Sequence, residues 1–205
     1  QQDGFLDKDL VKVDDLPKTD RPINQKWSWD RILRSPYIKQ ADVLQGFYFF
    51  EEDFSFEDLE KHFDFYEPFT VHESSLSPCV HSIQAAKLGR MEQAYNFYLR
   101  TSRLDLDDYN KEVEEGLHIT SMAGTWMSIV EGFGGMRVIG DKLSFKPQIP
   151  NQWKAYSFKV NFRNRIIKVN VTKESTTFEL SGSKEVSIRV NGKKVELFPD
   201  ELVTV

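Results

Sequence analysis

The chain has 205 residues, of which 40% are hydrophobic and 29% charged, a composition typical of globular proteins rather than of disordered or fibrous ones. Its net charge of −5 disfavours general nucleic-acid binding, and no apolar run approaches the roughly 20 residues of a membrane-spanning helix. The single cysteine, Cys79, cannot form an internal disulfide. We therefore expect a reducing compartment, the cytoplasm, with no nucleic-acid partner and no membrane.

Charge and hydrophobic periodicity both change near residue 141. Residues 151–205 carry a net charge of +4 and residues 1–150 carry −9, while the apolar period drops from helical spacing to alternation. We predict a mainly helical part, residues 1–141, followed by a β part, residues 142–205. The chain begins at Gln1 without methionine or a leader-like stretch, so we expect it to be a piece of a longer polypeptide.

The first 34 residues are polar and interrupted by prolines, with an early Asp3-Gly4 turn. This pattern predicts a long connection, residues 1–34, which a few side chains such as Trp27 and Trp29 anchor to the rest of the protein.

Helix signals then follow one another. Ser35-Pro36 and Ser77-Pro78 each place a capping residue before proline, and Ser55 with Asp58 three residues later resembles a capping box. The predicted helices begin near residues 36, 56, 78, 91 and 119, and they end near residues 50, 66, 88, 98 and 133. The last helix carries one broad apolar stripe, formed by Ile119, Met122, Trp126, Ile129, Val130 and Phe133. Short loops between these helices favour antiparallel packing of neighbours.

Beyond Lys142 the sequence alternates between apolar and polar residues. Residues 156–162, 167–171 and 186–190 follow this pattern, and Asn191-Gly192 is a strong hairpin signal. Six or seven short strands predict a small antiparallel β-sandwich. Because this part holds neither histidine nor cysteine, we expect it to stabilise the protein rather than to carry its chemistry.

Several motifs for metal or cofactor chemistry are incomplete. His72-Glu73 lacks the second histidine of a zinc protease, since the fourth position on is Leu76. Gly132-Phe133-Gly134-Gly135 follows a predicted helix rather than a strand, so it is not a dinucleotide loop. Cys79, in a first helical turn, is expected to be a small buried hydrophobe. We predict no metal site and no organic cofactor.

Three segments place polar groups where packing alone does not require them. These are residues 39–42, within the first turns of an otherwise apolar predicted helix, and residues 71–77 and 116–121, each before a helix start. Hydroxyls, imidazoles and free backbone N–H groups at helix starts suit an oxyanion such as phosphate. Ordinary helix capping with satisfied histidines is the alternative interpretation.

Five motifs carry a resemblance that extends over nearly the whole chain. They are WSWDRILRS from Trp27, IKQADV from Ile38, YEPFTVHESSLSPC from Tyr66, RLDLD from Arg103 and GLHITSM from Gly116. Together they resemble the disaccharide phosphorylases of glycoside hydrolase family 65, and the last two are similar to the branch that acts on maltose. The resemblance implies the C-terminal part of an (α/α)₆ barrel followed by a β domain, in a longer, homodimeric enzyme whose general acid lies upstream of Gln1.

The implied reaction is inverting: maltose and phosphate give β-D-glucose 1-phosphate and D-glucose. No catalytic residue is expected in this chain, and phosphate is a co-substrate rather than a cofactor. Asp42 and Glu73 are expected to orient neighbours. The resemblance places Lys39 and Gln40 on the glucosyl unit, and the candidates for phosphate are His118, Ser121, His72, Ser74 and Ser75, with Thr120 through its backbone N–H.

Two alternatives remain open at this point. One is a phosphorylase or hydrolase of another α-glucoside in the same family, because acceptor choice depends on loops outside this sequence. The other is a non-catalytic region that binds carbohydrate or only stabilises the protein.

Overall fold

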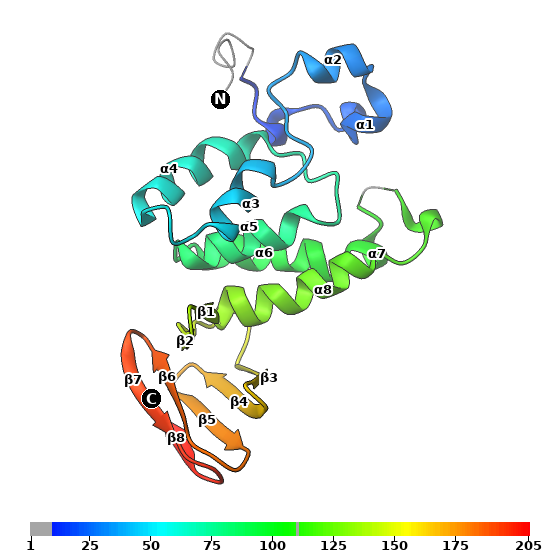
Figure 1. The fold of residues 1–205 in the computed structure, drawn as a ribbon. Coiled ribbons are helices and arrows are strands. Elements are labelled where there is room, and N and C mark those ends of the chain that lie inside the picture. Colours follow the sequence, from blue (N-terminus) through cyan, green and yellow to red (C-terminus); the bar gives the residue numbers. More distant parts are fainter. Residues whose placement is uncertain (1–9, 110) are drawn as a thin grey trace.

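The computed structural model describes residues 10–109 and 111–205, so the Asp3-Gly4 turn lies outside the described residues. Helices occupy the N-terminal two thirds of the chain and two small sheets the C-terminal third (Figure 1). This agrees with the mixed architecture that the periodicity predicts. Among the residues described, the structure contains no helix whose length and apolarity would allow it to cross a membrane.

The described part of the connection, residues 10–34, holds short helical turns rather than irregular chain alone. They are the 3₁₀ turns Val13–Asp15 and Lys18–Asp20 and the helices α1, Ile23–Lys26, and α2, Trp29–Leu33. Trp27 anchors this segment, because its ring meets the edge of Tyr37 with centroids 5.6 Å apart. Trp29 is 75% exposed, so its prediction as an anchor is wrong.

Helix α3 spans Asp42–Phe49 and starts later than the sequence predicts. The Ser35-Pro36 start is wrong because the backbone of Ile38 is already paired: its N–H donates to Phe69 and its carbonyl accepts from Val71. Those bonds hold the chain extended before the helix. Lys39 and Gln40 therefore lie in the segment that leads into α3, not within its first turns.

The next helices match the predicted positions closely. Helix α4, Phe56–Tyr66, begins with the predicted capping box, in which Ser55 and Asp58 bond reciprocally. After the 3₁₀ turn Glu67–Phe69 come α5, Ser77–Lys87, and α6, Met91–Ser102, with Gly89 between them in the left-handed region at a φ of 75°. Short α7, Leu104–Asp107, and the 3₁₀ turn Val113–Glu115 lead to the last helix.

The last helix has two parts. Helix α8 spans Ile119–Met127 and continues without a break as a π-helical turn, Ser128–Phe133. Its apolar stripe is divided in the same way. Ile119, Met122 and Trp126 are exposed, whereas Val130 and Phe133 are fully buried.

Two four-stranded sheets follow. One has the order β1-β2-β6-β7 and the other β3-β4-β5-β8, and every pairing is antiparallel except that of β2 with β6. The predicted hairpin is confirmed, since Asn191 and Gly192 join β6 to β7 with positive φ at both positions. The strands are β1 Arg137–Ile139, β2 Lys142–Phe145, β3 Ala155–Phe162, β4 Arg165–Thr172, β5 Thr176–Ser181, β6 Val186–Val190, β7 Lys193–Leu197 and β8 Leu202–Thr204.

The two sheets share one apolar core, in which Phe145 of one sheet lies 5.5 Å from Phe178 of the other, ring centre to ring centre. A second core lies between the helices, and Trp153 joins the two parts by packing on Phe133. The junction is tight at Gly134, where a Cβ would lie 2.9 Å from the Phe158 ring. The β part is thus packed directly against the end of the last helix.

Candidate functional site

The structure brings together the three polar segments that the sequence analysis selects. Ile38 forms a parallel bridge with Thr70, and the carbonyl of Lys39 accepts a hydrogen bond from the N–H of Glu73 at 3.1 Å. Residues 38–39 therefore run beside residues 70–73. This pairing places the Lys39-Gln40 segment next to the loop that carries His72, although more than 30 residues separate them in sequence.

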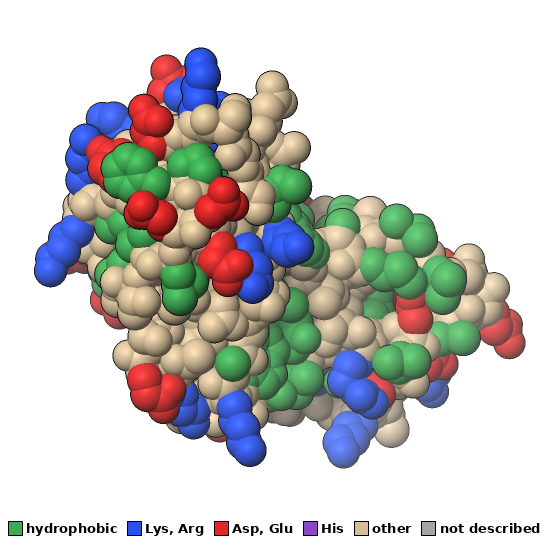
Figure 2. Space-filling model, turned by 90° about the horizontal axis from the view of Figure 1, so that it is seen from below, with side chains coloured by type: hydrophobic (Ala, Val, Ile, Leu, Met, Phe, Trp, Pro, Cys, Tyr) green, Lys and Arg blue, Asp and Glu red, His purple; other side chains and the backbone are tan. Residues whose placement is uncertain are grey.

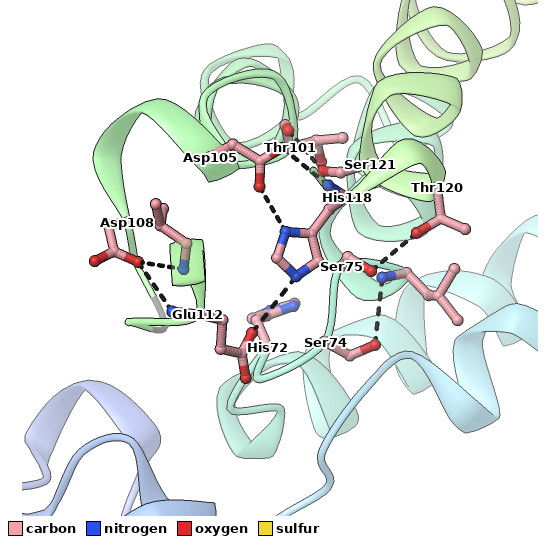
Figure 3. A network of polar contacts seen from close by, with 12 residues as sticks. His72, Ser74, Ser75, Thr101, Asp105, Asp108, Glu112, His118, Thr120 and Ser121 are labelled. Carbon is pink, nitrogen blue, oxygen red and sulfur yellow. Dashed lines mark hydrogen bonds and ion pairs between the residues drawn. The ribbon is translucent and has the colours of Figure 1, made fainter. Parts of the chain in front are cut away.

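The third segment joins the same place through a hydroxyl pair. The Oγ of Ser75 lies 3.0 Å from the Oγ1 of Thr120, in the first turn of α8 (Figure 3). Ser74, beside it, accepts a hydrogen bond from the N–H of Leu76 and so shapes the loop. Hydroxyls from two segments thus meet at a helix N-terminus, where aligned backbone dipoles favour an anion.

His118 stands immediately before α8 and is held by one carboxylate. The Nδ1 of its imidazole lies 2.5 Å from one oxygen of Asp105, and its backbone N–H donates to the other oxygen at 3.0 Å. The two bonds hold the pKa of Asp105 below its ordinary value, so the carboxylate is ionised at neutral pH. The Nε2 of His118 lies 4.0 Å from Glu112.

Ser121 makes its hydrogen bond inside the protein. Its side chain is buried, and its hydroxyl donates to the carbonyl of Thr101 on α6 at 2.7 Å. That bond ties the start of α8 to the end of α6. The hydroxyl of Ser121 is therefore buried as well as bonded, whereas Ser75, Thr120 and His118 are less deeply buried.

His72 is also buried, beneath the loop rather than on it. Its Nδ1 lies 2.8 Å from the Oγ of Ser77, and its ring packs edge-on against His81 and at a tilt against Phe97. Burial holds the pKa of His72 well below its ordinary value, so the imidazole is neutral. Burial likewise lowers the pKa of His81, to about 4. Neither ring supplies a positive charge to an anion at neutral pH.

Two charged residues hold the loop that carries His72 in place. The guanidinium of Arg100 donates to the carbonyls of Val71 and His72, at 3.3 and 3.1 Å. The buried carboxylate of Glu73 accepts from the backbone N–H groups of Ile23 and Asn24 at the start of α1. Glu73 thereby ties the N-terminal segment to the site.

Lys39 and Gln40 border the same loop at the surface. Lys39 is exposed, and no ion pair to it is found among the described residues. The amide of Gln40 donates to Asp42 at 3.0 Å. These two side chains are close to the loop through their backbones and remain available to a ligand.

Sequence reasoning did not select Asp105, Glu112 or Arg100. Arg100 lies in the last turn of α6, and Asp105 lies in α7. The RLDLD motif, which contains Asp105, was used only as evidence of a family resemblance. An acidic residue 13 positions before His118 has no helical or strand spacing that would pair them. Only the three-dimensional fold reveals these contacts.

The residues described include the single cysteine and all four histidines of the chain. They contain no group of three or more His, Cys, Asp or Glu side chains arranged to hold a metal ion. Cys79 is buried, as predicted, and burial raises the pKa of its thiol. The site is therefore defined by hydroxyls, one accessible imidazole, an exposed lysine and a helix start.

Comparison with protein families identifies the family of the chain. The model of the glycosyl hydrolase family 65 central catalytic domain matches residues 1–127, and that of the glycosyl hydrolase family 65 C-terminal domain matches residues 136–197. The chain belongs to glycoside hydrolase family 65.

Individual relatives are phosphorylases of several disaccharides. The chain is 54% identical to maltose phosphorylase of Bacillus subtilis over 96% of its length, and 42% identical to α,α-trehalose phosphorylase of Thermoanaerobacter brockii over 98%. It spans 26% of each of these relatives. A solved structure from the human microbiome, described as a candidate kojibiose phosphorylase, superposes on the whole chain with a TM-score of 0.91 and 41% identity, and the chain covers 28% of it.

Proposed function

We propose that this chain is the C-terminal part of an inverting disaccharide phosphorylase, which converts maltose and phosphate into β-D-glucose 1-phosphate and D-glucose. The observation that carries the proposal is the meeting of residues 38–40, 72–76 and 118–121 at one helix start, with Ser75 and Thr120 in contact. The 54% identity to maltose phosphorylase of Bacillus subtilis supports the choice of maltose.

The chemistry of this reaction explains the composition of the site. An inverting glycosidase needs a general acid for the leaving oxygen and a carboxylate base for the attacking water. Phosphate is already an anionic nucleophile, so a phosphorylase requires donors that hold it instead of a base. A phosphate oxygen attacks C1 from the face opposite the departing glucose, and the acid protonates the glycosidic oxygen.

Each candidate residue takes a role that follows from its position. His118, Ser74, Ser75 and the backbone at Thr120 hold phosphate, and Lys39 with Gln40 holds hydroxyls of the glucosyl unit. The buried His72 and Ser121 support the loop and the helix start from beneath. The general acid is contributed by residues outside this chain, and the reaction uses no metal or organic cofactor.

The wider assembly belongs to the same proposal. Residues 1–136 form the C-terminal part of an (α/α)₆ barrel, and residues 137–205 form the β domain, which starts with β1 slightly before the boundary that the sequence predicts. The complete enzyme is a cytoplasmic homodimer. The exposed apolar side chains of α3 and α8 support the barrel, because faces of this kind pack against further helices.

A second candidate differs only in the sugar. The 42% identity to α,α-trehalose phosphorylase favours a phosphorylase of another α-glucoside as the alternative. The groups that face the shared glucosyl unit and phosphate are the same in both cases. The distinction therefore depends on the acceptor sugar.

The proposal is tested on the full-length protein with maltose, trehalose or kojibiose, each with and without phosphate. We expect β-glucose 1-phosphate, identified by the anomeric proton coupling in NMR, from maltose and only when phosphate is present. Release of glucose without phosphate would identify a hydrolase. If trehalose or kojibiose gives more product than maltose, that sugar is the substrate instead. No turnover of any sugar would contradict the proposal.

A further inference from the structure

The imidazole of His118 lies between two carboxylates. An oxygen of Asp105 lies 2.5 Å from Nδ1, and an oxygen of Glu112 lies 4.0 Å from Nε2 (Figure 3). All three side chains are mostly shielded from solvent, with 18 to 19% of each exposed. Within the described part of the chain, His118 is the one ion-pair partner found for Glu112.

Hydrogen bonds to the backbone at Glu112 fix the position of this residue. Asp108 adopts a left-handed conformation, with φ at 46°, and its carboxylate accepts from the N–H groups of Glu112 and Val113 at 2.9 and 3.2 Å. These bonds hold the turn that carries Glu112 beside His118. A carboxylate is thus built into the edge of a site that otherwise offers hydrogen-bond donors.

Nε2 is the ring nitrogen that a phosphate oxygen must reach, because Asp105 occupies the other nitrogen. An anion bound at Nε2 therefore lies beside the carboxylate of Glu112. A carboxylate repels an anion that carries no proton, but it accepts a hydrogen bond from one that does. Inorganic phosphate carries at least one proton at neutral pH, as HPO4²⁻ or H2PO4⁻, whereas sulfate is fully ionised.

We propose that Glu112 is a specificity-determining residue of this site, which accepts a hydrogen bond from protonated phosphate and rejects sulfate, while Asp105 positions His118 to bind the same anion. This inference rests on the proposed function, because it requires phosphate to bind at His118. It extends that function by assigning the discrimination between two tetrahedral anions to one side chain. Arsenate, which also carries a proton near neutral pH, is accepted like phosphate.

The test measures, in the full-length enzyme at saturating maltose, the KM for phosphate and the inhibition constants of sulfate and arsenate. Three variants are compared with the wild type: Glu112→Gln, His118→Ala, and Glu114→Gln as a matched control on the same turn, where Glu114 is exposed. Melting temperatures are measured for each variant to confirm folding.

We expect Glu112→Gln to lower the sulfate inhibition constant about tenfold or more relative to the phosphate KM, because an amide can donate to sulfate where a carboxylate repels it. Arsenate should continue to follow phosphate, and Glu114→Gln should change neither value. An unchanged ratio in Glu112→Gln, together with a raised phosphate KM in His118→Ala, overturns this inference alone. An unchanged phosphate KM in His118→Ala overturns the phosphate site itself.

Discussion

The helical part and the β part of this chain differ in how completely they bury their own apolar residues. The sheets face each other across one core, and Phe178, Ile167 and Val190 have no exposed surface. In the helical part, Ile119 is 66% exposed and Trp126 is 48% exposed. Seen from below, hydrophobic side chains lie open at the right of the view, where α7 and the start of α8 are located (Figure 2).

The two parts therefore obtain their stability in different ways. The alternating pattern of the β strands is satisfied inside residues 137–205, where both sheets contribute to one core. The amphipathic stripe of α8 is satisfied only at Val130 and Phe133. The chain spans 26% of its phosphorylase relatives, and its site lies on the part whose apolar surface is incomplete. The predictions below test this contrast.

The largest effect concerns activity. We predict that these 205 residues alone neither phosphorolyse nor hydrolyse maltose, because the proposed function places the general acid and the remaining barrel helices outside this sequence. The assay is glucose and glucose 1-phosphate release by the purified chain, with the full-length protein as positive control. Turnover above the level of a mock purification would contradict the prediction.

The second prediction compares one residue from each part. Phe178→Ala should lower the free energy of unfolding by about 3–5 kcal/mol, because it opens a cavity in a fully enclosed core. Trp126→Ala in the same chain should cost less than about 1 kcal/mol, since half of that ring is exposed. Urea unfolding of the chain measures both. Equal losses would show that the helical part is as self-contained as the sheets.

The third prediction concerns Lys39 in the full-length enzyme. Loss of a charged donor to a sugar hydroxyl costs about 1.5–3 kcal/mol, so Lys39→Ala should reduce kcat/KM for maltose roughly 10- to 150-fold. The reverse synthesis should fall by a similar factor, because both directions use the same glucosyl unit. Unchanged kinetics in both directions, with a normal melting temperature, would show that Lys39 is a surface residue that does not contact the sugar.

The fourth prediction separates phosphate from sugar recognition. His118→Ala should raise the phosphate KM about tenfold or more, roughly 1.4 kcal/mol, while the KM for maltose and the melting temperature change little. The imidazole lies at the site edge, so its removal leaves both cores intact. A clear loss of stability with an unchanged phosphate KM would instead make His118 a structural residue.

The smallest effect lies far from the site, at the start of α4. Ser55→Ala removes one half of a capping box and should destabilise the chain by about 1 kcal/mol. The bonds from Ser55 hold the pKa of Asp58 below its ordinary value, so their contribution is present above that value and is lost as pH falls through the lowered pKa. Urea titrations at neutral and acidic pH should show the mutant penalty shrinking in acid.

Local signals in the sequence predicted the fold where the decisive contacts are close in the chain. The Ser55–Asp58 capping box, the Asn191-Gly192 hairpin and the alternation in residues 156–162 each depend on neighbours within a few positions. The start of α3 depends instead on the pairing of Ile38 with residues 69–71, more than 30 positions away. No pattern near Ser35-Pro36 reports that pairing.

The same limit applies to the candidate site. Hydroxyls before helix starts pointed to two segments that the fold brings together, since Ser75 meets Thr120. Ser121 has the same local appearance, yet its hydroxyl donates to Thr101 and is buried. Sequence identifies the chemical groups that a segment carries. The direction in which each group points depends on packing against α6, which the spacing of residues does not encode.

The π-helical turn Ser128–Phe133 also sets how the β part is oriented. An α-helix advances by roughly 100° per residue, and a π turn advances by less because it fits more residues into each revolution. The turn follows the half-exposed side chain of Trp126 and itself carries the buried side chains of Val130 and Phe133. Deleting one residue here would rotate both sheets about the helix axis and part Phe133 from Trp153. The π-helical turn thus helps to set the orientation of the β part relative to the helices.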